Sequence, residues 1–404
     1  MPLFLILFCV LIVMIGLGIT LPVLPFYVER LALADGVSRQ SIAMHVGLLT
    51  AVFVMGQLFF APMWGLLSDQ IGRRPLILIG IAGYVISQVL FGFSNSLRLL
   101  YVARILGGIL SSATLPVAAA YIADMTIDDE RTRGMAWLGT VTSLGFVIGP
   151  ALGGILSRRD LHFTAQYGHF MINSFSIPFF AAAILAFFTL FVAMKWLPES
   201  LHATSVKAED TKIDWRGLAQ SLGPLLCVAI AGQFALAIFE GTFALYAQAK
   251  FNYGPVEVGA VFVVCGLVMA IFQVGAVNFL VGRISEINQI GIGFGLMGMS
   301  LLLLAIAPTK FFIFVFVGLL ALGMSFISPN LAALISKRNG SRHIGSALGV
   351  QNAANSFGQM SGLLLGSALF VWKMNAPYLL TGVLLVLVAF GIGWNNQPRV
   401  QELE

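Results

Sequence analysis

The chain has 404 residues, of which 59% are hydrophobic and only 10% are charged. A soluble globular protein has about a quarter of its residues charged, so this composition excludes a protein whose whole surface faces water. The net charge of +5 is spread over short polar segments and forms no basic patch typical of nucleic-acid binding. The apolar residues form continuous runs and lack the alternation of barrel strands, which predicts an all-α membrane protein.

Twelve apolar runs follow one another, each long enough to cross a bilayer as a helix of roughly 20 residues. The first six lie near 3–28, 45–67, 75–94, 97–124, 134–157 and 171–195, and the last six lie near 217–248, 256–281, 288–308, 310–335, 344–370 and 376–394. The longest polar segment separates the two groups. This pattern is typical of two-lobed transporters. It predicts an N-terminal six-helix lobe at 1–197, a linker at 198–216, a C-terminal six-helix lobe at 217–395 and a tail at 396–404.

The distribution of Lys and Arg predicts the orientation in the membrane. The loops on the side of Arg73 and the linker hold the larger share of basic residues, which places that side in the cytoplasm. We therefore expect a multi-pass protein of the plasma membrane with both termini cytoplasmic. The first run is longer than the apolar core of a signal peptide and has no basic segment before it, so we expect it to be retained as a helix.

The turn between the runs 45–67 and 75–94 carries charges of both signs, although a plain connecting turn needs only a small or soluble residue. Its sequence is GLLSDQIGRR. We expect it to form a charge network with the end of the run 97–124, and we call these residues the latch: Gly65, Asp69, Gly72, Arg73, Arg74, Asp124 and Arg131. The alternative is a solvated turn whose ion pairs contribute about 0–1 kcal/mol each.

Arg104 lies inside the apolar run 97–124. An arginine in a bilayer costs roughly 2.5–3.5 kcal/mol on insertion scales, so such a residue normally faces the bundle interior or a wet cavity. We expect a buried cation that influences a nearby proton-binding group. The alternative is a side chain that reaches the outer surface of the membrane.

Four segments resemble motifs of the major facilitator superfamily. They are GLLSDQIGRRPLIL at 65–78, LGFVIGPALGGI at 144–155, the proline-bearing GLGITLPVLPFY at 16–27, and Arg104 in LYVARILGGILSSA. The second is similar to the helix 5 motif of the twelve-helix drug/proton antiporters, the exporter subgroup. The second half most resembles the NorA-type quinolone exporters. In this resemblance, Glu240 matches the glutamate that those exporters have in helix 7. Ser325 stands where that group has an aspartate in helix 10.

The resemblance implies that the latch stabilises the outward-open state. It also directs attention to the helix 5 residues Gly145, Gly149, Pro150, Gly153 and Gly154. Three of these glycines are four residues apart and share one helix face, and small residues let membrane helices approach closely. We expect this face to seal against the second lobe when the outer side is closed. The alternative is the small-residue packing common to membrane helices.

Glu240 lies well inside the run 217–248, with no Lys or Arg within one helical turn. An ionised carboxylate is costly in an apolar interior, which favours its neutral form. We expect Glu240 to take up a proton on one side and release it on the other, and to attract a cationic substrate when ionised. Arg104 is its expected partner in proton coupling. The alternative is a polar contact between helices or a place at the outer mouth.

A substrate cavity needs apolar walls and a few polar groups. Amides are costly in lipid when unpaired, so those of the run 344–370 are expected to face a central cavity. The candidates for that cavity are Gln57, Gln233, Phe234, Phe243, Phe326, Asn330, Gln351, Asn352 and Asn355.

The sequence therefore predicts a monomeric transporter in the lipid bilayer that exports small amphipathic or cationic compounds in exchange for protons. No GxxxxGK[ST] loop and no cluster of catalytic groups appears, so we expect no enzyme activity and no cofactor. The cysteines and histidines lack metal-ligand spacing, and we expect no metal. Two alternatives remain: an exporter dedicated to one endogenous metabolite such as a siderophore or sugar derivative, and a lipid flippase.

Overall fold

The structure is a computed structural model. It describes residues 2–126, 128–158, 164–167, 170–200, 215–280, 284–339 and 344–395. These residues form helices almost throughout, as a chain in lipid requires, because a helix satisfies its own backbone hydrogen bonds.

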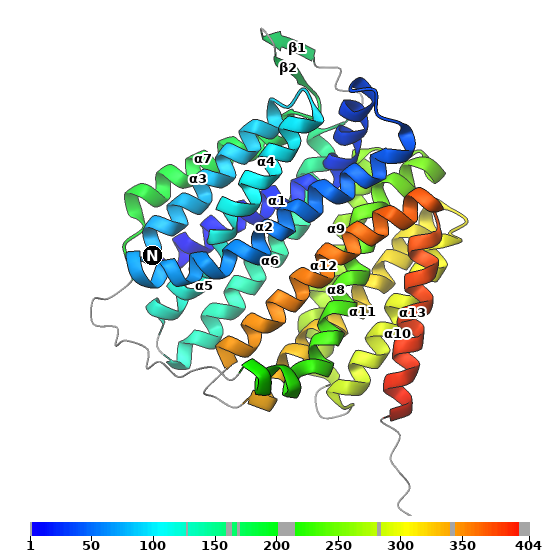
Figure 1. Cartoon of the computed structure of the whole chain (residues 1–404). Helices are drawn as coiled ribbons and strands as arrows, with labels where there is room; N and C mark the ends of the chain where they lie inside the picture. The colour runs from blue at the N-terminus through cyan, green and yellow to red at the C-terminus, as the bar shows by residue number, and fades with distance from the viewer. Residues whose placement is uncertain are drawn as a thin grey trace, which may run out of the picture.

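The first lobe contains the N-terminal group of helices (Figure 1). Its elements are α1 (Pro2–Ala34), the 3₁₀ turn η1 (Arg39–Ser41), α2 (Ile42–Ile71), α3 (Arg73–Gly92), α4 (Leu97–Leu110), the 3₁₀ turn η2 (Ser111–Ala113), α5 (Thr114–Met125), α6 (Asp128–Leu156), β1 (Thr164–Tyr167), β2 (Phe170–Asn173) and α7 (Ile177–Trp196). The segment from α4 through η2 to α5 makes a single crossing interrupted by a tighter turn.

The second lobe contains the remaining helices. They are α8 (Trp215–Phe251), α9 (Pro255–Leu280), α10 (Glu286–Ala305), α11 (Lys310–Asn339), α12 (Ile344–Trp372) and α13 (Ala376–Asn395). Within the described residues, ten helices are long and apolar enough to cross a membrane, and a shorter apolar helix spans Ala376–Ile392. The predicted all-α fold with two six-helix lobes is confirmed, and each predicted run overlaps one helix, or, for the run 97–124, the pair α4 and α5.

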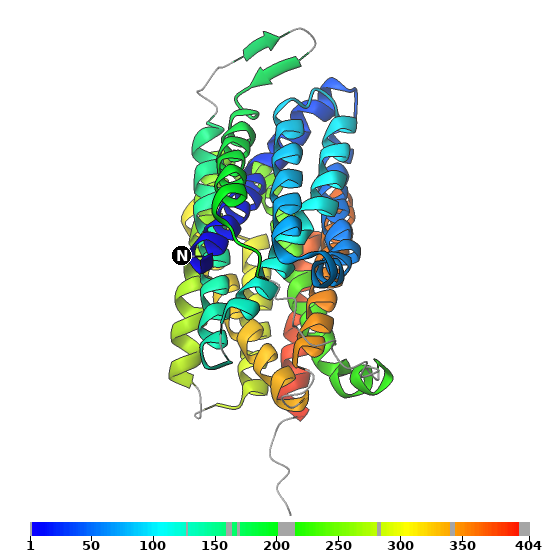
Figure 2. The same ribbon diagram turned by 90° about the vertical axis from the view of Figure 1, so that its left-hand side faces the viewer.

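One segment differs from the sequence-based expectation. The run 171–195 was expected to be helical from its start, but an antiparallel β-hairpin pairs Thr164 with Asn173, and α7 begins only at Ile177. The Asn173 side chain accepts a hydrogen bond from the Phe175 amide (2.9 Å), which turns the chain before the helix. The hairpin marks one end of the molecule, which we call the hairpin side (Figure 2). The opposite end, at the Gly72 turn, is the linker side.

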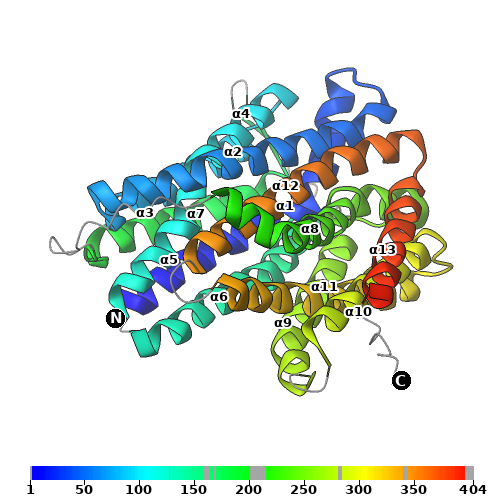
Figure 3. The ribbon, with the colours of Figure 1, turned by 60° about the horizontal axis from the view of Figure 1, so that its bottom comes forward.

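The two lobes pack against each other along two pairs of helices, α2 with α12 and α6 with α9 (Figure 3). An apolar cluster joins Phe53 of α2 to Ala237 of α8 and Leu363 of α12. At the hairpin end of α6 the two lobes approach closely, because a Cβ on Gly154 would lie 2.8 Å from the Pro255 carbonyl oxygen. The lobes are therefore in tight contact on the hairpin side.

Candidate functional site

The latch centres on Arg73, which begins α3 and is mostly buried. Its Nη1 atom lies 2.5 Å from Asp69 Oδ1 at the end of α2, and its Nε atom lies 3.0 Å from Asp124 Oδ2 at the end of α5. It also donates to the Ser68 hydroxyl. One guanidinium thus joins three helix ends, as its fixed fork of donors allows.

Glu199, just beyond α7, completes this cluster. Its two carboxylate oxygens accept the backbone amides of Arg73 (2.8 Å) and Arg74 (3.1 Å). These are the first amides of α3, which have no partner within the helix and carry its positive dipole end. The next residue, Ser200, donates its hydroxyl to Asp124 (3.1 Å). The start of the segment that links the lobes is thereby bonded to the latch.

The remaining latch residues, two glycines and two arginines, have different surroundings. Gly72 has φ +105°, and a Cβ there would lie 2.5 Å from Glu199 Oε2, so this turn requires glycine. Outside its own stretch of helix, no atom of the described residues lies within 4 Å of a Cβ on Gly65, so none of them constrains the packing there. The Arg74 guanidinium donates to the Met194 carbonyl oxygen (2.6 Å), and it forms no ion pair with a carboxylate of the described residues, which differs from its expected pairing. The Arg131 side chain lies outside the described residues.

Arg104 is buried in the first lobe, as expected for a costly charge. Its guanidinium carbon lies 5.2 Å from the ring centroid of Phe53 and 5.1 Å from that of Phe91. Aromatic faces attract cations most strongly where water is excluded. Its Nε atom has no hydrogen-bond partner, and no described carboxylate forms an ion pair with it. Arg104 and Glu240 are thus not brought into direct contact.

Glu240 lies in the middle of α8 and remains partly accessible between the buried residues Phe239 and Gly241. The Gln359 side chain of α12 hydrogen-bonds to its carboxyl group, and Cys265 of α9 lies near enough for an electrostatic effect. The carboxyl group therefore sits between three helices of the second lobe.

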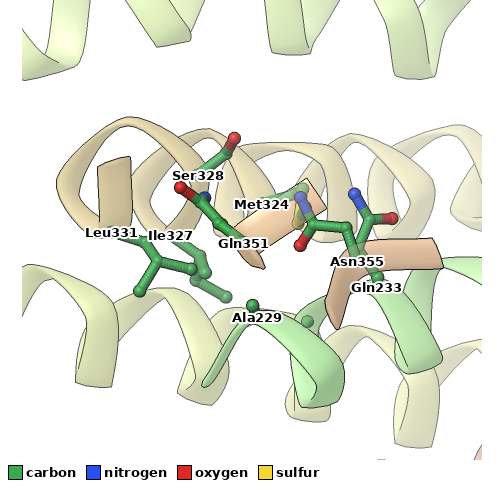
Figure 4. A pocket seen from close by; sticks show the side chains of 9 residues that line it. Ala229, Gln233, Met324, Ile327, Ser328, Leu331, Gln351 and Asn355 are labelled. Atoms are coloured by element: carbon green, nitrogen blue, oxygen red, sulfur yellow. The ribbon is translucent and has the colours of Figure 1, made fainter. Parts of the chain in front are cut away.

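A pocket lies between α8, α11 and α12, and three of the predicted amides point into it: Gln233, Gln351 and Asn355 (Figure 4). Its apolar wall is formed by residues such as Met324, Ile327 and Leu331. Apolar walls with a few polar groups are typical of small-molecule sites, but the free volume of this pocket is only about 10 Å³, so it holds no more than a water molecule in this conformation.

The other predicted cavity residues do not line this pocket. Phe243 is fully buried against Phe239 and Phe262, and Asn330 is buried with its amide donating to Gln289 (3.0 Å). Their assignment to a cavity wall is wrong in this conformation, because packing and hydrogen bonding already satisfy them. Asn352 is exposed, and Gln57, Phe234 and Phe326 are partly exposed outside the pocket.

A profile of the Major Facilitator Superfamily matches residues 6–290 and 276–402. The chain belongs to the major facilitator superfamily.

Several relatives within the superfamily resemble the chain over nearly its whole length. Multidrug resistance protein 2 of Bacillus subtilis (strain 168) is 26% identical over 95% of this chain and 93% of the relative. The quinolone resistance protein NorA of Staphylococcus aureus (strain MRSA252) is 28% identical over 95% of both chains. The class G tetracycline resistance protein of Vibrio anguillarum is 29% identical over 93% of both.

The fold is also found in solved structures of other transporters. A bacterial homologue of the human lysosomal transporter Spinster, crystallised in an inward-facing and occupied conformation, superposes with a TM-score of 0.77. The match covers 97% of this chain and 95% of that chain at 12% identity, which shows a common fold alone.

The helix 5 motif of this superfamily member packs differently from the expectation. A Cβ on Gly149 would lie 2.6 Å from the Gly18 Cα atom, and one on Gly153 would lie 2.5 Å from the Ile19 carbonyl oxygen. This glycine face, with Gly145, therefore packs on α1 of its own lobe, and the expected seal against the second lobe is wrong for these three residues. Gly154 and Pro150 make that contact instead, since both lie against α9 at Gly259.

Sequence reasoning missed Glu199 because it assigned this residue to the polar linker. The sequence did contain a local signal for this role. Glu199 directly follows Pro198 and the last apolar residues of a helix, on the same side of the membrane as the Gly72 turn. Ser325, which replaces the expected helix 10 acid, is buried and bonds back to the Ala321 carbonyl oxygen (2.8 Å). It leaves no charge in that part of α11.

Proposed function

We propose that this superfamily member exports small amphipathic or cationic compounds in exchange for protons by alternating access. The names of its relatives, which refer to multidrug, quinolone and tetracycline resistance, support a role in efflux. The single observation that carries the proton-coupling part of the proposal is Glu240, an acid in the middle of an apolar helix of the second lobe whose carboxyl group hydrogen-bonds to Gln359.

Exchange requires that proton and cargo do not bind together. Ionised Glu240 attracts a cation, and protonated Glu240 does not, so one carboxyl group makes the two binding events exclusive. Its neighbour Gln359 can donate to the ionised form and accept from the protonated form, which lets both states exist in the same place. The amide-lined pocket on the neighbouring faces of α8 and α12, which has a volume of about 10 Å³ here, would have to widen in another arrangement of the lobes to hold the rest of the cargo.

Alternating access requires two arrangements of the lobes. The structure has the lobes packed together on the hairpin side. We propose that the linker side is cytoplasmic, with both termini there, and that this arrangement is the inward-facing state. The latch then forms within the first lobe alone and is free to bind the second lobe when the linker side closes. One chain supplies both lobes, which supports function as a monomer.

The proposal is tested with purified protein in liposomes. A pH gradient should drive ethidium across the membrane, and Glu240→Gln should abolish this movement. Glu257→Gln is the matched control. Glu257 is an exposed acid that accepts a hydrogen bond from the Gly254 amide, and a glutamine can accept the same bond. Ethidium transport by Glu240→Gln that still follows the pH gradient would contradict the proposal.

A second candidate is an exporter dedicated to one endogenous compound of lower charge. It is favoured by the neutral pocket, whose polar groups are amides and the Ser328 hydroxyl, and by Ser325 in place of an acid. Cells that express this protein should then show unchanged tolerance to a broad panel of cationic drugs. Movement of labelled lipid between leaflets by the purified protein would instead favour a flippase.

A further inference from the structure

A second cavity, of about 500 Å³, lies between the two lobes on the hairpin side. The first lobe contributes Glu29, Arg39 and Ile42, and the second contributes Leu245, Gln248 and Phe370. Leu245 is twelve residues beyond Gln233 along α8, which places it about 18 Å from the amide-lined pocket at 1.5 Å per residue. We call this cavity the outer cleft. It is separate from the amide-lined pocket, and Glu240, which lies between the two along α8, is not among its lining residues.

The outer cleft is closed at one point by a bond between the lobes. Gln248 Nε2 near the end of α8 donates to Glu29 Oε2 near the end of α1, at 2.6 Å. Both side chains remain partly accessible. The carboxylate oxygens of Glu29 have about four acceptor positions between them, so this single bond leaves capacity for a ligand.

The lining offers both signs of charge beside an apolar surface. Glu29 supplies a carboxylate, and Arg39, at the start of η1, supplies an exposed guanidinium. Leu245 and Ile42 are buried walls, and Phe370 presents a partly accessible ring. Small-molecule sites have volumes of about 300–1,000 Å³ and combine apolar walls with a few placed polar groups, and the outer cleft fits both criteria.

We propose that the outer cleft binds a zwitterionic amphiphile. The amine of the ligand pairs with Glu29, its carboxylate pairs with Arg39, and its apolar body packs on Leu245 and Phe370. A purely cationic ligand is repelled by Arg39 and a purely anionic ligand by Glu29, so the cleft selects for molecules with both charges.

The position of the cleft gives such a ligand a defined effect. Residues of both lobes form the site, so it exists only while the lobes are together on the hairpin side. A bound ligand stabilises that arrangement and slows any cycle that must open it. This inhibition rests on the proposed alternating access, whereas binding itself does not.

Three probes that share one ring system test the proposal: 2-naphthylalanine (zwitterion), 2-naphthylmethylamine (cation) and 2-naphthylacetate (anion). Binding to the purified full chain in nanodiscs is measured by calorimetry. The zwitterion should bind at least tenfold more tightly than either singly charged probe. Glu29→Gln should remove its advantage over the anion, and Arg39→Gln should remove its advantage over the cation. Glutamine at position 29 can still accept the bond from Gln248, so the lobes stay joined.

Two control variants distinguish binding in the outer cleft from binding elsewhere on the protein. Lys373→Gln removes an exposed charge just beyond α12 and outside the lining, and it should leave all three affinities unchanged. Glu240→Gln should also leave them unchanged while abolishing proton-driven export. Equal affinities of the three probes, or loss of zwitterion binding in Glu240→Gln but not in Glu29→Gln, would overturn the proposal. If export proves to be independent of protons, the probe affinities are unaffected.

Discussion

The Nε atom of Arg73 lies 3.0 Å from Oδ2 of Asp124, and this ion pair joins the start of α3 to the end of α5. The same guanidinium reaches Asp69, while the backbone amide of Arg73 is held by Glu199. Arg73 therefore connects four helix ends of the first lobe, including the end of α7 from which the linker departs. Glu199 and Ser200, which precede the linker, are bonded to the same cluster.

Asp69→Asn tests the latch. Asp69 is 59% exposed in its side chain, so its pair with Arg73 contributes about 0–1 kcal/mol to the free energy of unfolding. We expect the thermal midpoint of the purified protein to change little. Transport should fall severalfold, because even a small free energy shifts the populations of two conformers. Unchanged transport rates in liposomes would show that the latch is only a solvated turn.

Glu199 gives a sharper test, because its role is to cap a helix. Glu199→Ala leaves the first two amides of α3 without acceptors and should lower the free energy of unfolding by about 1 kcal/mol. Glu199→Gln keeps an acceptor oxygen and loses only the charge at the positive end of the helix dipole. It should therefore lower the free energy of unfolding by less than Glu199→Ala does. The measurement is thermal unfolding in detergent at low and high salt. Equal loss in both variants would assign the effect to charge alone.

The glycines of α6 provide matched variants on one helix. Gly149→Ala places a Cβ 2.6 Å from the Gly18 Cα atom, and overpacking of this kind costs about 1–3 kcal/mol. Gly139→Ala meets no atom within 4 Å and should be neutral or stabilising, since alanine favours a helix by about 1 kcal/mol over glycine. The readout is the thermal midpoint of each variant. Equal midpoints for the two variants would contradict the packing of α6 on α1.

Gly154→Ala should act differently from Gly149→Ala, because its Cβ would meet α9 of the other lobe. We expect the lobes to separate more easily on the hairpin side with little loss of overall stability. Val256 lies at this contact, so Val256→Cys serves as the probe. Its thiol should react faster with a water-soluble maleimide in the double variant Gly154→Ala, Val256→Cys than in the single variant Val256→Cys. An unchanged labelling rate would show that this contact does not limit opening.

The crossings could be predicted from the sequence because a bilayer demands a long apolar segment for each one. The run 97–124, for example, corresponds to the span Leu97–Met125. Its interruption at Ser111–Ala113 could not be predicted, since serine also occurs within regular helices and nothing in the local pattern requires a tighter turn there. The β-hairpin before α7 was missed because its second strand, Phe170–Asn173, merges with the start of the apolar run 171–195.

The candidate site could be predicted only in part. Periodicity indicated that Gly145, Gly149 and Gly153 share a helix face, but it does not say which helix covers that face. The charges of the latch were visible, yet the choice of Met194 as the partner of Arg74 depends on where α7 ends. Gln351 and Asn355 were expected at a cavity because unpaired amides are costly in lipid; they line the pocket, and their role in cargo binding stays a prediction. Asn330 was misassigned because Gln289, distant in sequence, already satisfies it.

The contact between Arg104 and Phe53 is open to a double-mutant cycle. Phe53→Leu keeps an apolar side chain but removes one of the two rings that face the guanidinium. Arg104→Met removes the charge and keeps an unbranched side chain. Because no described carboxylate pairs with Arg104, we expect the two rings to account for much of its stabilisation, with a coupling energy of about 0.5–2 kcal/mol between the two changes. The free energies of unfolding of the two single variants and the double variant measure it. Additive effects would show that Phe53 only fills space beside Arg104, and the cation would then depend on Phe91 alone.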